Sequence, residues 1–269
     1  MTTPQSVLAA FAIILIDLIG RAGVDKVLAL VGEPETIALW AQLQSVVELV
    51  SGVTIVGVLT GLTVMITQVR KSNEEPILLR YALKLTFITS LIVALVVASF
   101  SPVLSTWLTQ EKISAGLFLL AALIGCIGIF PATLNAYWLG KHQQQRMLRF
   151  ALLTSSIWLT VAIGAWLKIA ISGLLLMQCL TLAVIGLATW FYLRKLSGVA
   201  NPLKVHTEYR QQLMKFVPVG LAIGIMSPVS TLLIRGMLSQ MLSWEEVGIM
   251  QALWRSTEWI TASAAGILL

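Results

Sequence analysis

A small set of charged residues lies inside the apolar segments of this chain, and these residues are the first candidates for chemistry. Asp17, Arg21 and Asp25 follow one another at i, i+4 and i+8, so one helical face would carry a guanidinium between two carboxylates. Arg255 and Glu258 form an i, i+3 pair near the end of the chain. The remaining members of the set are Lys26, Glu48 and Arg235.

Charges of this kind are costly at bilayer depth, where each costs at least about 2.5 kcal/mol and normally faces a bundle interior or an aqueous cavity. All of them fall in the first two and the last two of eight apolar segments, whereas the four segments between have uncharged cores. This distribution predicts a polar cavity lined by the first two and the last two segments. For Asp25, Lys26 and Arg235 the alternative is a position at the membrane interface. For Arg21 and Arg255 it is neutralisation of nearby carboxylates.

The composition places these segments in a membrane. Of the 269 residues, 58% are hydrophobic and 11% are charged, and the mean hydropathy is +0.90. Soluble globular domains carry roughly 25% charged residues, so an ordinary cytosolic fold is excluded. A helix needs about 18 apolar residues or more to cross a bilayer. Uncharged blocks of this length lie at 85–108, 113–140, 150–167, 169–193 and 216–234.

Hydrophobic length and breaker residues together predict an all-α, polytopic membrane helix bundle of about eight transmembrane helices. The second of these is longer than a bilayer requires and contains Ser51, Gly52 and Gly57, so we expect a tilt or a bend there. The helices are predicted near residues 7–31, 36–69, 81–101, 113–140, 149–168, 171–194, 215–240 and 245–269.

Basic residues gather in three of the connections between these helices. The opposite connections carry only Lys112 and Lys168, so the positive-inside rule places the three basic loops and the amino terminus in the cytoplasm. The net charge of +6 is therefore a topology signal, and no nucleic-acid partner is expected. The basic loop residues are Arg70, Lys71, Arg80, Lys84, Lys141, Arg146, Arg149, Arg194, Lys195, Lys204, Arg210 and Lys215.

The longest polar connection divides the chain into two parts. It predicts a cytoplasmic interlobe linker at 196–214, between an amino-terminal six-helix lobe at 1–195 and the first two helices of a second lobe at 215–269. The pairs Glu35 with Glu48 and Glu245 with Glu258 have the same spacing in the second and eighth helices, which fits a duplicated lobe. Since the sequence ends in apolar residues, we expect the second lobe to be truncated.

The sequence predicts no metal, no cofactor and no catalytic residue. Cys126 and Cys179 lie in mid-helix among apolar residues, as small packing residues do. His142 and His206 lie in polar loops without a second ligand at metal spacing. A membrane enzyme such as a polyprenyl-phosphate sugar transferase would need an acidic metal-binding loop, and the cytoplasmic loops here are basic. We therefore expect a protein that binds or moves a solute and is not an enzyme.

Two stretches of this sequence resemble a known family. The stronger one lies near the carboxyl end and comprises FVPVG at 216–220, SPVS at 227–230, Ile234-Arg235 and SWEEVGIMQALWR at 243–255. The weaker one comprises Gly20-Arg21 and LWAQLQS at 39–45. These stretches resemble the polysaccharide-unit flippases, which are the O-antigen and enterobacterial-common-antigen translocases of the multidrug/oligosaccharidyl-lipid/polysaccharide exporter superfamily.

The resemblance implies two six-helix lobes around a central cavity, with a cationic lining that receives the pyrophosphate and sugars of an undecaprenyl-linked oligosaccharide. By this analogy Arg21, Arg235 and Arg255 would contact the anionic headgroup, because a guanidinium offers a forked donor set to phosphate oxygens. It also implies alternating access in a bacterial inner membrane, with membrane lipid and the polysaccharide polymerase machinery as partners. The residues left as ion-coupling groups or charge partners are Asp17, Asp25, Glu48 and Glu258.

Two alternatives stay open at this point. A multidrug extrusion antiporter of the same superfamily would use acidic residues for a coupling cation, and Asp17, Asp25 and Glu48 fit that role. The three arginines favour an anionic solute instead. A truncated remnant without transport of its own is the other alternative, because flippases of this family have twelve or more helices.

Overall fold

The structure is a computed structural model that describes residues 4–69, 75–197 and 207–268. All the secondary structure in these ranges is helical, which confirms the predicted all-α bundle. The elements are α1 (Pro4–Val31), α2 (Pro34–Thr54), the π-helix η1 (Ile55–Leu59), α3 (Thr60–Val69), α4 (Glu75–Ser99), α5 (Ser101–Thr109), α6 (Ala115–Ile127), α7 (Ile129–Gly140), α8 (Gln144–Trp166), α9 (Ile171–Ser197), α10 (Thr207–Met241) and α11 (Trp244–Leu268).

All eight predicted segments are present as helices, and the short helix α5 lies between the predicted segments 81–101 and 113–140, where a connection was expected. The second predicted segment comprises α2, η1 and α3 without a break, and α5 and α7 follow α4 and α6 after a single residue. Six helical segments in the described ranges are long and apolar enough to cross a membrane, by length and composition. The fold is therefore that of a helical membrane protein. The charged helices α1 and α11 are not among those six.

Helix α2 forms the centre of the bundle. Every residue from 37 to 46 is buried, and α2 packs against α6, α10 and α11. Most of these residues are apolar, as expected for a helix at a central position, and Gln42, Gln44 and Ser45 are buried among them. Helices α10 and α11 thus pack onto the amino-terminal helices, and they contact α2 much more than they contact each other. Helix α1 packs mainly against α8.

The predicted irregularity in the second segment is the π-helical turn η1, at the point where this segment meets α10. A Cβ at Gly220 would clash with the backbone of Gly57, and a Cβ at Gly224 would lie 2.8 Å from the carbonyl oxygen of Gly52. Since glycine has no side chain, the two backbones can pack in direct contact here. The second segment and α10 therefore approach each other closely.

Several predicted boundaries differ from the observed ones. Helix α9 extends to Ser197 and α10 already begins at Thr207, so the described parts of the predicted linker 196–214 are helical. The polar stretch from Glu208 to Lys215 is rich in good helix formers, and a helix can extend past the membrane edge where water solvates it. Residues 198–206 lie outside the described ranges. Likewise α4 begins at Glu75 rather than near residue 81.

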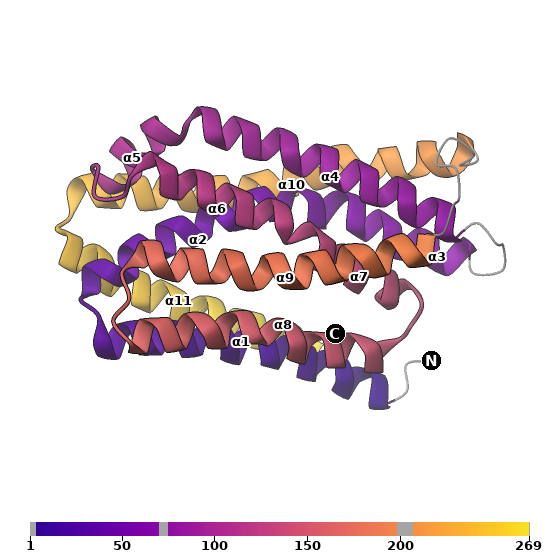
Figure 1. Cartoon of the computed structure of the whole chain (residues 1–269), viewed down its shortest axis with the longest axis horizontal. Helices are drawn as coiled ribbons and strands as arrows, with labels where there is room; N and C mark the ends of the chain where they lie inside the picture. Colours follow the sequence, from indigo (N-terminus) through magenta and orange to yellow (C-terminus); the bar gives the residue numbers. More distant parts are fainter. Residues whose placement is uncertain (1–3, 70–74, 198–206, 269) are drawn as a thin grey trace.

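Successive helical segments run in opposite directions along the long axis of the bundle (Figure 1). The amino terminus lies at the same end as the α7–α8 connection and the end of α3. The α10–α11 connection and α5 lie at the opposite end. The described helical segments therefore begin and end alternately at the two ends, in the order that the predicted topology requires.

Candidate functional site

A cavity of about 540 Å³ lies between α1, α2, α8 and α11, and it is the candidate functional site. Apolar residues of α1 form one wall, including Ile13, Ile14 and Leu18. The charged and polar side chains in its lining come from five helices, which lie far apart in the sequence. They are Asp17, Arg21, Glu48, Asn135, Thr154 and Arg255.

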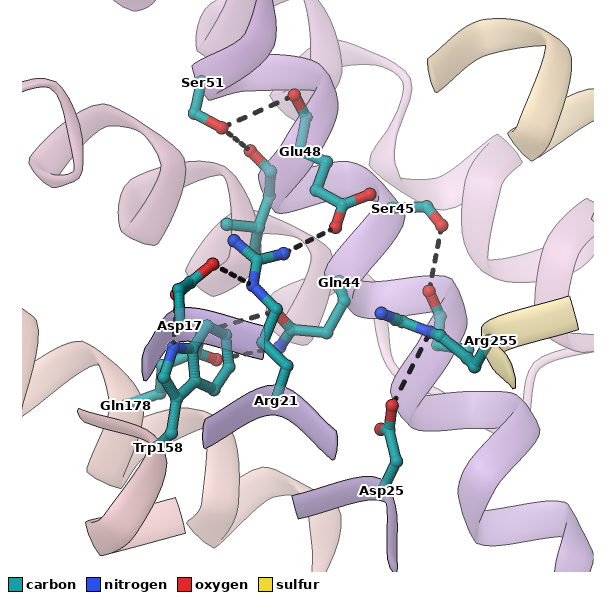
Figure 2. Close-up of polar contacts among 12 residues, drawn as sticks. Asp17, Arg21, Asp25, Gln44, Ser45, Glu48, Ser51, Trp158, Gln178 and Arg255 are labelled. Atoms are coloured by element: carbon teal, nitrogen blue, oxygen red, sulfur yellow. Dashed lines mark hydrogen bonds and ion pairs between the residues drawn. The ribbon is translucent and has the colours of Figure 1, made fainter. Parts of the chain in front are cut away.

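Arg21 is held at this cavity by three neighbours (Figure 2). Its Nε donates to Asp17 Oδ2 at 2.9 Å, and its Nη1 donates to Glu48 Oε1 at 3.1 Å. Its guanidinium carbon lies 5.0 Å from the ring centroid of Trp158, a cation–π geometry. The Trp158 Nε1 in turn donates to Asp17 Oδ1 at 3.0 Å. The guanidinium is thus bound by one carboxylate of its own helix and one of α2.

A glycine explains how α8 brings Trp158 to this position. A Cβ at Gly20 would lie 2.7 Å from Cδ1 of Trp158, so the residue preceding Arg21 must be very small for α1 and α8 to pack this closely. Asp17 lies one turn before Arg21, where an i, i+4 pair meets on a helix surface. The Arg21 site therefore depends on the close packing of α1 and α8.

Arg255 of α11 reaches the same cavity from the other side. Its Nε lies 4.0 Å from Asp25 Oδ2, and both side chains are almost buried, with 8% and 11% exposed. Arg255 also lines a second cavity of about 470 Å³, together with Asp25, Lys26 and Ser256. It therefore lies where the two cavities approach one another along α1.

Arg235 of α10 is not part of this site. It is 1% exposed and does not line either cavity. Its Nη1 donates to the carbonyl oxygen of Ala41 at 2.8 Å and contacts the hydroxyl of Ser45, both on α2. Its guanidinium lies over the ring of Trp254, at 5.8 Å. The structure thus brings Arg21 and Arg255 together and places Arg235 inside the α2–α10 packing, not at the interface position that was the alternative.

The charge pairs differ in part from the expected ones. Asp17 pairs with Arg21 as the spacing predicts, whereas Asp25 pairs with Arg255, and Glu48 takes the second place at Arg21. The side chain of Glu258, the expected partner of Arg255, lies outside the described part of the structure. Lys26 is exposed beside the second cavity.

The charged side chains at the two cavities form an ion-pair network, in which Arg21 pairs with Asp17 and Glu48, and Arg255 pairs with Asp25. The network has three carboxylates, those of Asp17, Asp25 and Glu48, and two guanidiniums. At Arg21 the side chains are about half-exposed, so an incoming anion can compete with the carboxylates for the guanidinium donors. Within the described residues no group of three or more His, Cys, Asp or Glu side chains could hold a metal ion.

Sequence reasoning missed the contribution of α7 and α8 to this site. Asn135, Thr154 and Trp158 lie on segments whose uncharged cores were expected to take no part in the cavity. One available signal was the position of Trp158 near the middle of its segment, because membrane tryptophans otherwise concentrate near helix ends.

The fold and the cavity together define a helical membrane protein with an ion-paired internal site. No protein-family model, no curated protein and no solved structure matches this chain. The assignment of a function therefore depends on the residues of the cavity and their geometry.

Proposed function

We propose that the protein is a flippase that moves an undecaprenyl-pyrophosphate-linked oligosaccharide across the bacterial inner membrane by alternating access, with its amino terminus in the cytoplasm. The observation that carries the proposal is the meeting of Arg21 and Arg255, from the first and last described helices, at one cavity among apolar helices. Two guanidiniums at one cavity suit a pyrophosphate, because each offers forked donors to phosphate oxygens.

The ion pairs supply a mechanism for reversible binding. When the cavity is empty of substrate, carboxylates neutralise both arginines and lower the cost of keeping them at membrane depth. A pyrophosphate would take over donors that Glu48 and Asp25 occupy, and Trp158 would hold the Arg21 guanidinium in place through its ring. Release of the substrate would restore the carboxylate pairs. Binding therefore exchanges one set of charge pairs for another, which keeps the substrate from being bound too tightly to leave.

Arg235 has a structural role in this proposal, because its donors face α2 rather than the cavity. The protein works as a binding and transport protein without chemistry on the substrate. The polysaccharide polymerase machinery is the partner that this function implies.

A binding measurement tests the proposal. We expect the purified chain to bind undecaprenyl pyrophosphate in native mass spectrometry, and Arg21→Ala or Arg255→Ala to lower the affinity about tenfold or more. Arg21→Lys should recover binding only in part, since the charge stays but the bidentate geometry is lost. The matched control is Arg149→Ala, which removes the same charge from an exposed position on α8 outside the cavity. Equal affinities of Arg21→Ala and Arg149→Ala would contradict the proposal.

A triple variant separates ligand binding from simple charge neutralisation. Replacing Asp17, Arg21 and Glu48 together by neutral residues of similar size removes both the guanidinium and the two carboxylates that pair with it. If Arg21 binds the pyrophosphate, this variant should fold and fail to bind. Retained affinity would show that Arg21 only neutralises its neighbours.

A second candidate function is a cation-coupled extrusion antiporter, and one observation favours it. Three carboxylates, those of Asp17, Asp25 and Glu48, lie at the two cavities, and carboxylate oxygens are the groups that a coupling cation would bind. Glu48→Gln distinguishes the two functions. It should raise the affinity for undecaprenyl pyrophosphate in a flippase, because Arg21 loses a competing partner, and it should abolish cation-driven transport in an antiporter.

A further inference from the structure

A cluster of polar contacts ties three connections together at the end of the bundle opposite the amino terminus. Gln110, directly after α5, bridges to the α10–α11 hairpin with both atoms of its amide. Its Nε2 donates to the carbonyl oxygen of Ser239 at 2.8 Å, and its Oε1 accepts from Trp244 Nε1 at 3.0 Å. The end of α5 is thereby joined to the end of α10 and the start of α11.

Lys112 adds a second bridge in the same place. Its Nζ lies 2.6 Å from Glu35 Oε1, in the first turn of α2, and 5.1 Å from the ring centroid of Trp244. The ring of Trp244 therefore takes part in two contacts, a hydrogen bond with Gln110 and a cation–π contact with Lys112. We name Glu35, Gln110, Lys112, Ser239 and Trp244 the clasp.

On either side of the clasp, α10 and α11 pack closely against the other helices. Gln240 Nε2 donates to the carbonyl oxygen of Trp107 at 2.9 Å, and the indole of Trp107 fills the space beside Gly236. A Cβ at Gly248 would clash with the backbone of Pro34. Helices α10 and α11 therefore pack closely against α2 and α5 at this end.

The backbone of the clasp is strained. Gln110 and Glu111 have φ values of 50° and 65°, so two successive residues other than glycine adopt the left-handed conformation. Such residues persist only where surrounding contacts hold them, and they concentrate at segments that switch between two arrangements. Backbone bonds from Gln110 N to the Thr106 carbonyl oxygen and from Glu111 N to the Ser105 carbonyl oxygen, both 3.1 Å, hold this turn together with the contacts of Gln110 and Lys112 with α2, α10 and α11.

The helix surfaces behind the clasp contain polar groups that the closed arrangement does not satisfy. Gln42 of α2 and Gln251 of α11 are 0% and 1% exposed, and neither amide makes a hydrogen bond within the described part of the chain. Buried amides without partners cost free energy that contact with water would recover. Opening this end would hydrate such groups, so part of the free energy needed to separate the helices would be recovered.

We propose that the clasp is a releasable closure of the cavity at this end of the bundle, and that it opens when α10 and α11 separate from α2 and α5. Its place in transport rests on the proposed function, since a flippase must expose Arg21 and Arg255 to each side of the membrane in turn. The closed clasp and the cavity between α1 and α8 then belong to the state that faces the amino-terminal side. Release of the clasp is the step that exposes the cavity to the other side.

Thiol labelling tests the clasp without any substrate. Ser239→Cys places a thiol at a position that is 1% exposed beneath Gln110, and native Cys179 on α9, 7% exposed, reports loss of the whole fold. The chain is reconstituted in lipid nanodiscs and treated with a water-soluble maleimide, and labelling of each cysteine is followed by mass spectrometry of peptides. With Gln110→Ala and Lys112→Ala added, we expect labelling at position 239 to become about tenfold faster while Cys179 is unchanged.

Two further variants make the test specific. Glu111→Gly relieves the strained turn without removing a clasp contact, so labelling at position 239 should become several-fold slower. Lys168→Ala is the matched control for Lys112→Ala, because Lys168 also has a positive φ of 57° but lies in the α8–α9 connection, away from α10 and α11. It should leave the labelling rate unchanged.

Three outcomes would overturn the clasp. The first is an unchanged rate after Gln110→Ala with Lys112→Ala, and the second is an equal acceleration by Lys168→Ala. The third is an equal acceleration at Cys179, which would mean that the variant has lost its fold rather than opened at one end. Because undecaprenyl pyrophosphate takes no part in the labelling, a failure of the flippase proposal would appear in the binding measurement and leave the labelling result as it is.

Discussion

The α2–α10 interface and the cavity beside α1 each hold an arginine within the apolar bundle, and they hold it in opposite ways. Arg235 at the interface is 1% exposed and bound by a carbonyl oxygen and a hydroxyl of α2. Arg21 at the cavity has 38% of its side chain exposed and is bound by two carboxylates. One arginine is enclosed by fixed neutral groups, and the other lies among charged groups that can move.

This difference indicates which arginine can bind a ligand. The partners of Arg235 include a backbone carbonyl within helix α2, which cannot move without the helix, so its guanidinium has little freedom to receive a substrate. The carboxylates at Arg21 end flexible side chains and face open space, so an anion can replace them at modest cost. The residue type is the same, and the partners decide its role.

Disrupting the α2–α10 interface should give the largest loss in the free energy of unfolding. Gly220→Leu forces a side chain into the backbone of Gly57, so we expect the free energy of unfolding to fall by about 3 kcal/mol, because overpacking must push the two helices apart. Gly23→Leu is the control, since a Cβ there meets nothing within 4 Å. Thermal unfolding of the two variants in detergent provides the measurement. Equal stability would mean that the glycine contact does not hold the helices together.

Removal of the buried Arg235 should give the second largest loss in the free energy of unfolding. Arg235→Ala leaves acceptors on α2 without their charged donor, and we expect a loss of about 2 kcal/mol in the free energy of unfolding. Binding of undecaprenyl pyrophosphate, measured in the fraction that stays folded, should change little. A stable Arg235→Ala variant that has lost binding would mean that Arg235 takes part in ligand binding.

Removal of the cavity arginine should have the opposite pattern. Arg21→Ala should change the free energy of unfolding by less than about 1 kcal/mol, because half-exposed ion pairs contribute little. The same variant should lose binding, as described above, so the ratio of the two effects separates Arg21 from Arg235. If Arg21→Ala lost as much stability as Arg235→Ala along with its binding, Arg21 would have a structural role like that of Arg235.

The smallest effect is expected for Trp158. Trp158→Phe keeps an aromatic ring under Arg21 and removes only the hydrogen bond to Asp17, so the stability should fall by about 0.5 kcal/mol. The affinity for undecaprenyl pyrophosphate should fall by about twofold to threefold, since the guanidinium is less well positioned. Isothermal titration of the two proteins side by side would detect this difference. A loss as large as that of Arg21→Ala would mean that Trp158 contacts the ligand directly.

The sequence alone determined the helical segments and the helices that carry charge. An apolar block long enough to cross the bilayer forms an α-helix, because a helix satisfies every backbone N–H and C=O group within the block. The i, i+4 spacing also predicted the pair of Asp17 with Arg21, since spacing along one helix is a local property. These features need no knowledge of which helices are neighbours.

Only the tertiary structure decided which charges meet. The pairing of Glu48 with Arg21 and of Asp25 with Arg255, and the enclosure of Arg235 by α2, depend on which helices adjoin and how each is rotated about its axis. Those quantities follow from the packing of many side chains at once, such as Trp158 against Gly20, and no spacing within a single segment contains them. The cavity therefore exists only when α1, α2, α8 and α11 are in place around it.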